Sequence, residues 1–330
     1  MSFVQNLFFF ENDYTILMSI WRISMLKYIL KRILASVITL WVVVTITFFM
    51  MHAIPGSPFT GEKKLPPAVL QNLERKWGLD KPLSTQYLTY LNNLVHGNLG
   101  PSLHFPGRTV NGIISVSFPV SAKVGLLAVA FSLIVGIYMG IVSALHQGKW
   151  QDNLCLIIAT LGVCVPSFVL AAFLSYGFAV KLHLLPAVGL YTPQSYIMPV
   201  IALSGFPLAF IARLTRSSLL DVVRQDYMRT AKAKGLSRNT IIYKHGLRNA
   251  LIPVVTYTGP LIAAVLTGSF VIERMFGIPG LGREFITSIQ NRDVTLTLGV
   301  TIFFGVFIVL CNLAVDIIYV LIDPRIQLEN

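Results

Sequence analysis

Charged side chains are scarce in this chain of 330 residues. Asp, Glu, Lys and Arg together make up 12% of it, whereas about 25% is usual in soluble proteins. Hydrophobic residues reach 55% and the mean hydropathy is +0.70, so a soluble fold could not cover its surface with polar groups. The composition therefore excludes a soluble protein and indicates an integral membrane protein. In such a protein, a net charge of +12 reflects the side of the membrane on which basic residues lie, and it does not indicate nucleic-acid binding.

Several chemical signatures are also absent. The three cysteines (Cys155, Cys164, Cys311) lie in apolar stretches and predict neither a disulfide framework nor a metal site. No G-x-x-x-x-G-K-[ST] sequence occurs, so the chain is not expected to bind and hydrolyse ATP with a phosphate loop of its own. There is no H-E-x-x-H sequence, and no cluster of His, Asp and Glu lies within the apolar stretches. We therefore predict no catalytic residue and no metal ligand in this chain.

Long apolar runs are what the sequence has in quantity. Six stretches without Asp, Glu, Lys or Arg meet or approach the roughly 20 residues that a helix needs to cross a bilayer; they are 33–51, 124–145, 154–180, 196–212, 249–272 and 294–315. Five prolines within them can kink the helices where neighbouring helices satisfy the freed carbonyls: Pro166, Pro199, Pro207, Pro253 and Pro260. The sequence thus predicts an all-α membrane protein with six transmembrane helices.

Two charged residues stand at the edges of these runs. Lys123 precedes the second run, and Asp316 lies about 9 Å from the end of the last predicted helix. We expect each of them to form a salt bridge or to extend its charge to the membrane surface. A proton-coupled carrier would usually expose a carboxylate or His within its spans, and no convincing inverted repeat is present. A stand-alone carrier or channel is therefore the less favoured alternative.

The basic residues predict the orientation in the membrane. Lys27, Lys31 and Arg32 lie just before the first run, which places the N-terminus in the cytoplasm. Residues 213–248 hold nine Lys and Arg but only two acids, whereas residues 273–293 hold three of each. Both termini and the segment 213–248 are therefore predicted to be cytoplasmic, in a multi-pass protein of the cell membrane.

The first 24 residues allow two interpretations. They are apolar but interrupted by Glu11 and Asp13, and they are too short to span. They form either an amphipathic helix on the membrane surface or a segment upstream of a true start at Met25. We favour an N-terminal extension that has no transport function.

Two segments outside the apolar runs have helical patterns. On the external side, apolar residues recur at helical spacing over 66–77 and 86–95, which predicts an ordered subdomain within 53–122. On the cytoplasmic side, Asp226 is placed to start a helix over 227–234, Gly235 to cap its end, and Ser237 to begin a second helix that runs to about Arg248. The positive-inside rule would explain the bases here, but not a structured helix–turn–helix with small residues at its tip. We therefore favour docking of a partner.

Several short sequences together resemble a known family. They are Met25-Leu26-Lys27-Tyr28-Ile29-Leu30-Lys31-Arg32, Gly97-Asn98-Leu99-Gly100-Pro101-Ser102, Arg229-Thr230-Ala231-Lys232-Ala233-Lys234-Gly235-Leu236, Phe276-Gly277-Ile278-Pro279-Gly280-Leu281-Gly282, Asn291-Arg292-Asp293 and Asp323-Pro324-Arg325. Over about 25–326 the chain resembles the permease subunit of a binding-protein-dependent ABC importer, of the B-type in the oligopeptide, dipeptide and nickel group. Arg229 and Thr230 stand where the general importer signature has Glu and Ala, while Ala231 and Gly235 are retained.

The resemblance implies a fold and a division of the chain. It implies a six-helix type I importer permease with an external helical loop subdomain. The first transmembrane helix and that subdomain would occupy 25–117, the transmembrane domain 118–323 and a cytoplasmic tail 324–330. The family's coupling element would lie at 226–248, with contacts to the ATPase from Asp226, Arg229, Ala231, Gly235, His245 and Arg248.

The resemblance also implies the partners. These are a second, similar permease, two ATP-binding subunits that bind ATP and Mg²⁺ in place of this chain, an external substrate-binding protein and a peptide substrate. This chain would be a non-catalytic transport subunit. Oligopeptides are the first choice of substrate, and dipeptides or nickel chelates are the alternatives.

Overall fold

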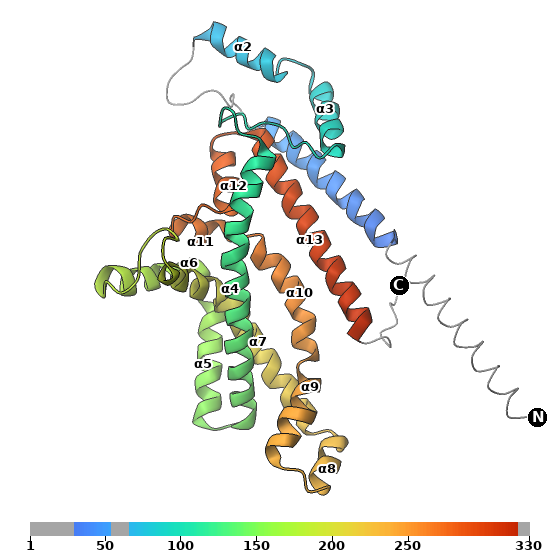
Figure 1. Cartoon of the computed structure of the whole chain (residues 1–330), viewed down its shortest axis with the longest axis vertical. Coiled ribbons are helices and arrows are strands. Elements are labelled where there is room, and N and C mark those ends of the chain that lie inside the picture. The colour runs from blue at the N-terminus through green and yellow to red at the C-terminus, as the bar shows by residue number, and fades with distance from the viewer. Residues whose placement is uncertain (1–29, 54–65, 323–330) are drawn as a thin grey trace, which may run out of the picture.

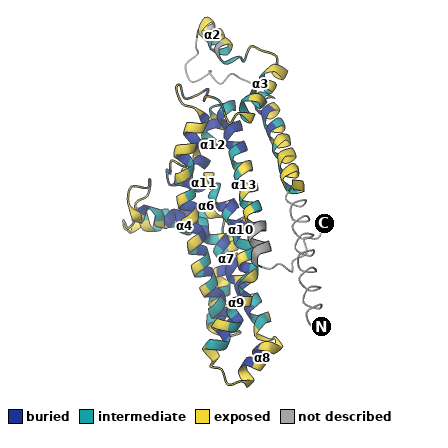
Figure 2. Cartoon of the chain, turned by 45° about the vertical axis from the view of Figure 1, so that its right-hand side comes forward, coloured by how far each residue is buried: buried dark blue, intermediate teal, exposed yellow. Residues whose placement is uncertain are grey.

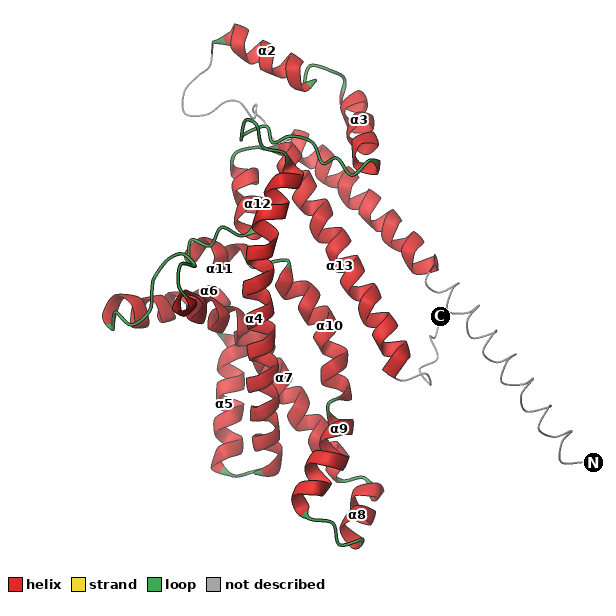
Figure 3. Cartoon of the chain, viewed as in Figure 1, coloured by secondary structure: helices red, strands yellow, loops and turns green. Residues whose placement is uncertain are grey.

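The structure is a computed structural model that describes residues 30–53 and 66–322, apart from a few side chains (Figure 1). The expectations for residues 1–24, for the start at Met25 and for the tail 324–330 lie outside the described residues. Within them the regular structure is helical (Figure 3), and the only β-type contact is an isolated bridge between Pro101 and Thr109. The prediction of an all-α protein is confirmed.

Within residues 30–53 and 66–322, four continuous helices are long and apolar enough to cross a membrane. They are Leu30–Ala53, α4 (Val110–Leu145), the stretch Pro193–Val223 formed by η2 (Pro193–Tyr196) and α7 (Ile197–Val223), and Val294–Ala314 within α13 (Val294–Ile322). The shortest predicted run, 196–212, lies within a helix that continues well beyond it. The helix continues beyond the apolar stretch through Arg213 and Arg216 to Val223.

Two of the predicted spans are bent helix pairs. α5 (Trp150–Cys164) meets α6 (Ser167–Leu174) and the π-helix η1 (Ser175–Lys181) at 107°. Pro166 stands at this break, because a proline cannot continue the helix and holds the residue before it extended. The predicted span 154–180 is therefore bent at Pro166, one of the prolines expected to kink these helices, and it is a single span only if this bent pair counts as one.

The fifth predicted span is also interrupted. η3 (Thr240–Gly246) and α9 (Leu247–Ala250) meet α10 (Ile252–Leu266) at 45°. α10 ends at Leu266, short of the predicted end at 272, because Gly268 takes φ +87° and turns the chain into α11 (Phe270–Met275). The count of six spans agrees with the structure only if each bent pair is one span.

Glycines let the central helices approach closely. α4 runs along α7, with α5 and α10 beside them (Figure 1). A Cβ atom at Gly140 of α4 would lie 2.5 Å from the Cβ of Thr215 in α7, and one at Gly136 would lie 2.9 Å from a methyl carbon of Ile211. Close approach at small residues supplies packing energy where lipid provides no hydrophobic drive. Buried residues concentrate along this contact, whereas the outer faces expose apolar side chains (Figure 2).

The helical subdomain predicted from the sequence is present at one end of the molecule. α2 (Pro67–Trp77) and α3 (Leu83–Val95) form its two helices (Figure 1). α3 is joined to the first helix by hydrogen bonds between Thr45 and Tyr87 (2.6 Å) and between His52 and Gln86 (3.2 Å). We call this end the α2 end and the opposite end, where α8 lies, the α8 end.

Candidate functional site

The segment predicted to dock a partner forms a helix, a glycine turn and a second helix at the α8 end. α8 spans Asp226–Ala233. Lys234, rather than Gly235, is its C-cap, and Gly235 follows with φ +77°. The amide of Gly235 donates to the carbonyl of Lys232 (3.0 Å), and that of Leu236 donates to Ala231 (3.4 Å). The glycine therefore provides the left-handed residue that ends the helix.

The second helix begins as predicted but contains a wider turn. The hydroxyl of Ser237 accepts from the amide of Thr240 at 3.3 Å, which caps the helix start. The backbone then follows the π-helix η3 before α9. π-turns inside helices occur frequently at functional sites.

Side chains hold the two helices together and onto α7. Met228 of α8 is buried, and its methyl group lies 3.2 Å from the position that a Cβ on Gly246 would take. The amide of Asn249 donates to the hydroxyl of Tyr227 at 2.9 Å. Only Arg224 and Gln225 separate α7 from α8. The segment is thus joined to α7 through these two residues and through contacts of η3 and α9 with that helix.

The six residues implied by the resemblance occupy different environments. Asp226 and Arg229 are exposed and form a weak ion pair at 3.7 Å. Gly235 and Arg248 are also exposed, His245 is half-buried, and Ala231 is buried. The four exposed residues are accessible to a partner. Ala231 faces inward, so its contribution within this chain is to packing.

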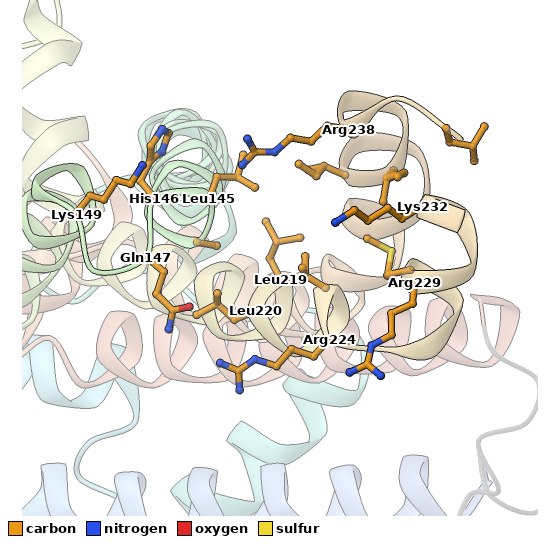
Figure 4. A pocket seen from close by; sticks show the side chains of 16 residues that line it. Leu145, His146, Gln147, Lys149, Leu219, Leu220, Arg224, Arg229, Lys232 and Arg238 are labelled. Atoms are coloured by element: carbon orange, nitrogen blue, oxygen red, sulfur yellow. The ribbon is translucent and has the colours of Figure 1, made fainter. Parts of the chain in front are cut away.

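A pocket of about 750 Å³ lies beside α8 (Figure 4). It is bounded by the α4–α5 turn, the end of α7, α8 and the start of the second helix. Its floor is apolar and includes Leu219, Met228 and Ile242, all buried. Its six basic residues come from all of these elements, and they are His146, Lys149, Arg224, Arg229, Lys232 and Arg238.

No acid lines this basic pocket. In Figure 4, His146 and Lys149 face Arg238 and Lys232 across the opening. Cationic groups on a rim attract negative charge, while an apolar floor favours burial of apolar side chains. The arrangement suits an acidic protein surface that carries apolar residues. Of the six residues implied by the resemblance, only Arg229 lines the pocket.

A buried ion pair fixes the α4–α5 turn beside this pocket. Both carboxylate oxygens of Asp152 in α5 accept from the guanidinium of Arg216 in α7, each at 2.9 Å. The same carboxylate accepts from the hydroxyl of Ser143 in α4 and from the amide of Gly148 (2.9 Å). Asp152 is 2% exposed. A paired and fully hydrogen-bonded carboxylate can be buried without leaving charge unsatisfied, so three helices are held together here.

A second carboxylate joins distant segments at the α2 end. Asp293 is buried before α13 and accepts from the amide of Leu296 (3.1 Å), which caps the helix. It also accepts from the hydroxyl of Ser102 and from the amide of Leu103 (3.2 Å). Two of the short sequences behind the family resemblance, 97–102 and 291–293, therefore meet in space.

Glu273 of α11 holds the first turn of α12 (Leu281–Gln290) against α4. It accepts from the hydroxyl of Ser121 (2.7 Å) and from the amide of Arg283 (3.0 Å). Burial raises the pKa of its carboxyl, and these hydrogen bonds partly oppose the rise. Among the described residues, no group of three His, Cys, Asp or Glu side chains could hold a metal ion.

Sequence reasoning missed the α4–α5 turn and its ion pair. The turn lies some 80 residues before α8 in the chain, so no local pattern connects the two. One signal was available, because Asp152 is the only acid between Asp80 and Asp221. A lone carboxylate at the end of an apolar run needs a basic partner, and Arg216 was among the bases counted.

Comparisons with known proteins agree with the resemblance. Residues 132–328 match the family model for the binding-protein-dependent transport system inner membrane component, and residues 25–124 match the model for the N-terminal part of such components. The dipeptide transport system permease protein DppB of Bacillus subtilis is 45% identical over 306 residues, which cover 93% of this chain and 99% of that protein. The oligopeptide transport system permease protein OppB of Salmonella typhimurium is also 45% identical. The match covers 92% of this chain and 100% of that protein.

Two solved transporter structures share the fold. One is an amino acid ABC transporter with histidines (TM-score 0.52, 15% identity); the match covers 63% of this chain and 93% of that chain. The other is the inward-facing MetNI methionine ABC transporter (TM-score 0.53, 17% identity). The match covers 62% of this chain and 94% of that chain. At these identities the likeness shows the fold alone.

Proposed function

Because the chain belongs to the inner-membrane components of binding-protein-dependent transport systems, we propose that it is the permease subunit of an ATP-driven importer of oligopeptides. Relatives named as oligopeptide permeases support this substrate. A dipeptide substrate is the second candidate, because the DppB protein of Bacillus subtilis is equally similar at 45% identity. A nickel chelate has no support from these relatives.

The helix–turn–helix at 226–248 is the observation that carries the proposal. It continues α7 through only two residues, exposes Asp226, Arg229 and Gly235, and borders a pocket with a basic rim. This arrangement suits a contact that receives force from another subunit. We place the ATPase subunit here, with an acidic, partly apolar surface against the basic pocket. ATP and Mg²⁺ are bound there and not by this chain.

The proposed complex has four further subunits. A second permease pairs with this one to enclose the pathway, two ATPase subunits lie at the α8 end, and a substrate-binding protein docks at the α2 end. The nine bases of 213–248 support a cytoplasmic α8 end. Both termini of the chain are then cytoplasmic, and the subdomain of α2 and α3 is external.

The path of movement follows from the contacts. Closure of the ATPase dimer displaces α8, and α7 moves with it because only Arg224 and Gln225 join the two helices and because η3 and α9 also contact α7. α4 and α5 follow, since Asp152 joins them to Arg216 of α7. The helices thus move together, as alternating access by rigid-body motion requires.

Substitution of Gly235 tests this function. Gly235→Asp forces a side chain into φ +77°, where L-residues are strained, although no atom of this chain lies within 4 Å of the new Cβ. The strained turn should weaken the binding free energy of the ATPase contact by about 1–3 kcal/mol. The variant complex should insert normally, retain less ATPase on co-purification and import little peptide.

Gly107→Asp is the matched control. Gly107 has φ +79° and equally open surroundings, but it lies in the loop at the α2 end. It should retain the ATPase. If Gly235→Asp kept the ATPase and imported peptide normally, 226–248 would not be the coupling element.

A further inference from the structure

Lys123 is the one charged residue of α4. Residues 124–145 carry no charged side chain, and at 1.5 Å per residue they cover about 33 Å, close to the thickness of the hydrocarbon core. Lys123 precedes this stretch on the side of the α2 end. With 124–145 as the membrane span that the sequence predicts, Lys123 lies at the membrane boundary, which is external in the proposed orientation.

This ammonium group has an aromatic partner and no acidic one. Nζ of Lys123 lies 4.7 Å from the centre of the Tyr196 ring, at the start of α7. Among the described residues, no carboxylate forms an ion pair with it. The negative face of an aromatic ring attracts a cation but does not neutralise its charge. Of the two outcomes expected for Lys123, the salt bridge is therefore absent among the described residues, and the positive charge is available to another group.

Lys123 also lines a pocket of about 730 Å³. The walls come from α4, from the loop 190–193 and from the start of α7, and they include Phe131, Ile134 and Tyr196. Pockets of this size hold small organic ligands, in which apolar walls supply burial and a few polar groups set the orientation. A ligand with apolar side chains and one anionic group matches the lining.

We propose that this pocket receives the C-terminal part of the transported peptide and that Lys123 binds its terminal carboxylate. This inference rests on the proposed peptide import and adds a binding site within it. A free peptide carries one carboxylate at its end and apolar or polar side chains beside it. The external boundary of the membrane is where such a peptide arrives from the binding protein.

Coupling of the peptide to the protein tests the contact directly. The complete complex is incubated with a tetrapeptide whose N-terminus is dimethylated, so that it keeps its charge but cannot condense with itself. A carbodiimide then activates the peptide carboxylate, which acylates a lysine amine in contact with it. Mass spectrometry should find the peptide on Lys123, and the same peptide with a C-terminal amide should not couple.

Lys181 is the matched control. Its Nζ lies 5.6 Å from the ring of Tyr176 and it also ends a predicted span, but it does not line the pocket. The peptide should couple to Lys181 about tenfold less than to Lys123. A hydrogen bond to a charged group stabilises a complex enough to account for a factor of this size. Equal coupling at the two lysines, or none at Lys123, would overturn the proposal.

Uptake by the complex tests the consequence. Lys123→Gln should lower the ratio of maximal uptake rate to KM about tenfold for the free peptide, whereas Lys123→Arg keeps the charge and Lys181→Gln leaves the pocket intact, so both should import normally. If Lys123→Gln imported peptide normally while Gly235→Asp did not, the pocket inference would fail and the proposed function would stand. If the unmodified complex imported no peptide, the proposed function itself would fail.

Two other occupants give different results. An anionic lipid headgroup would suppress coupling at Lys123 in bilayers of phosphatidylglycerol relative to phosphatidylcholine. A carboxylate of the second permease would make Lys123→Gln release that subunit on purification. Either result would contradict the proposal, which requires equal coupling in both lipids and an intact permease pair.

Discussion

At the scale of single residues, Asp152 and Asp293 are buried carboxylates that hold helix ends in place. Asp152 binds groups from α4, from the α4–α5 turn and from α7, and Asp293 binds groups from the loop 102–104 and from the start of α13. The first lies near the α8 end and the second at the α2 end. Each accepts hydrogen bonds from backbone or side-chain donors that would otherwise be buried without a partner. A buried donor without a partner destabilises a protein by about 1–3 kcal/mol.

Removal of the Asp152 carboxylate should destabilise the protein. Asp152→Ala leaves the guanidinium of Arg216, which is 24% exposed, without its buried partner. We expect the free energy of unfolding to fall by about 3 kcal/mol. A lower midpoint of thermal unfolding in detergent would show this fall. The double variant Asp152→Leu with Arg216→Met should recover much of that loss, because no unpaired charge remains. Additive effects of the two changes would show that the pair is not coupled.

At the scale of elements, glycines set the distance between the long helices. Gly136 and Gly140 form one small-residue face of α4 against Ile211 and Thr215 of α7. Gly162 of α5 approaches α7 in the same way, since a Cβ there would lie 2.6 Å from the carbonyl oxygen of Gly205. α7 is therefore the helix around which α4 and α5 pack, and it is also the helix that continues into α8.

Enlargement of one of these glycines should separate the helices. The added methyl group of Gly140→Ala would lie 2.5 Å from Cβ of Thr215 and 2.7 Å from the carbonyl oxygen of Ala212. Relief of this overlap should cost about 1–3 kcal/mol and lower the midpoint of thermal unfolding. Gly177→Ala is the control, because no atom lies within 4 Å of its new Cβ. An equal midpoint for both variants would contradict the close α4–α7 contact.

At the scale of the whole molecule, function depends on which end faces the cytoplasm. The α2 end carries a helical subdomain, and the α8 end carries the helix–turn–helix and the basic pocket (Figure 1). Several outer faces remain apolar and exposed, including that of the first helix, where Trp41 is 54% exposed. Lipid and a second permease would cover such faces in the proposed complex.

Cysteine labelling tests the orientation. Leu88 is 64% exposed on α3 and Arg238 is exposed at the start of the second helix. After replacement of the three native cysteines by serine, Leu88→Cys should react with an impermeant maleimide from the external side. Arg238→Cys should react only after the membrane is permeabilised, because the basic segment is proposed to be cytoplasmic. Labelling of both positions from one side would rule out this topology.

The sequence by itself determined those features that depend on short stretches of chain. Apolar runs predicted the spans, helical spacing predicted α2 and α3, and the order Asp226, Gly235, Ser237 predicted the helix–turn–helix. These signals are local, because each reports the burial or the capping of a single helix. Prolines were visible as possible kinks, but the 107° bend at Pro166 depends on what packs on either side of it.

Only the tertiary structure decided which distant residues meet. Asp152 pairs with a residue 64 positions away and Ser102 with one 191 positions away, and no periodicity connects such pairs. Lys123 illustrates the same limit, since the sequence left a salt bridge and a charge at the membrane surface as alternatives, while the fold places it over Tyr196 in a pocket without a carboxylate. The physical reason is that a buried polar group is satisfied by whichever donor or acceptor the helix packing brings within about 3 Å, and that packing is set by side-chain shape along entire helices.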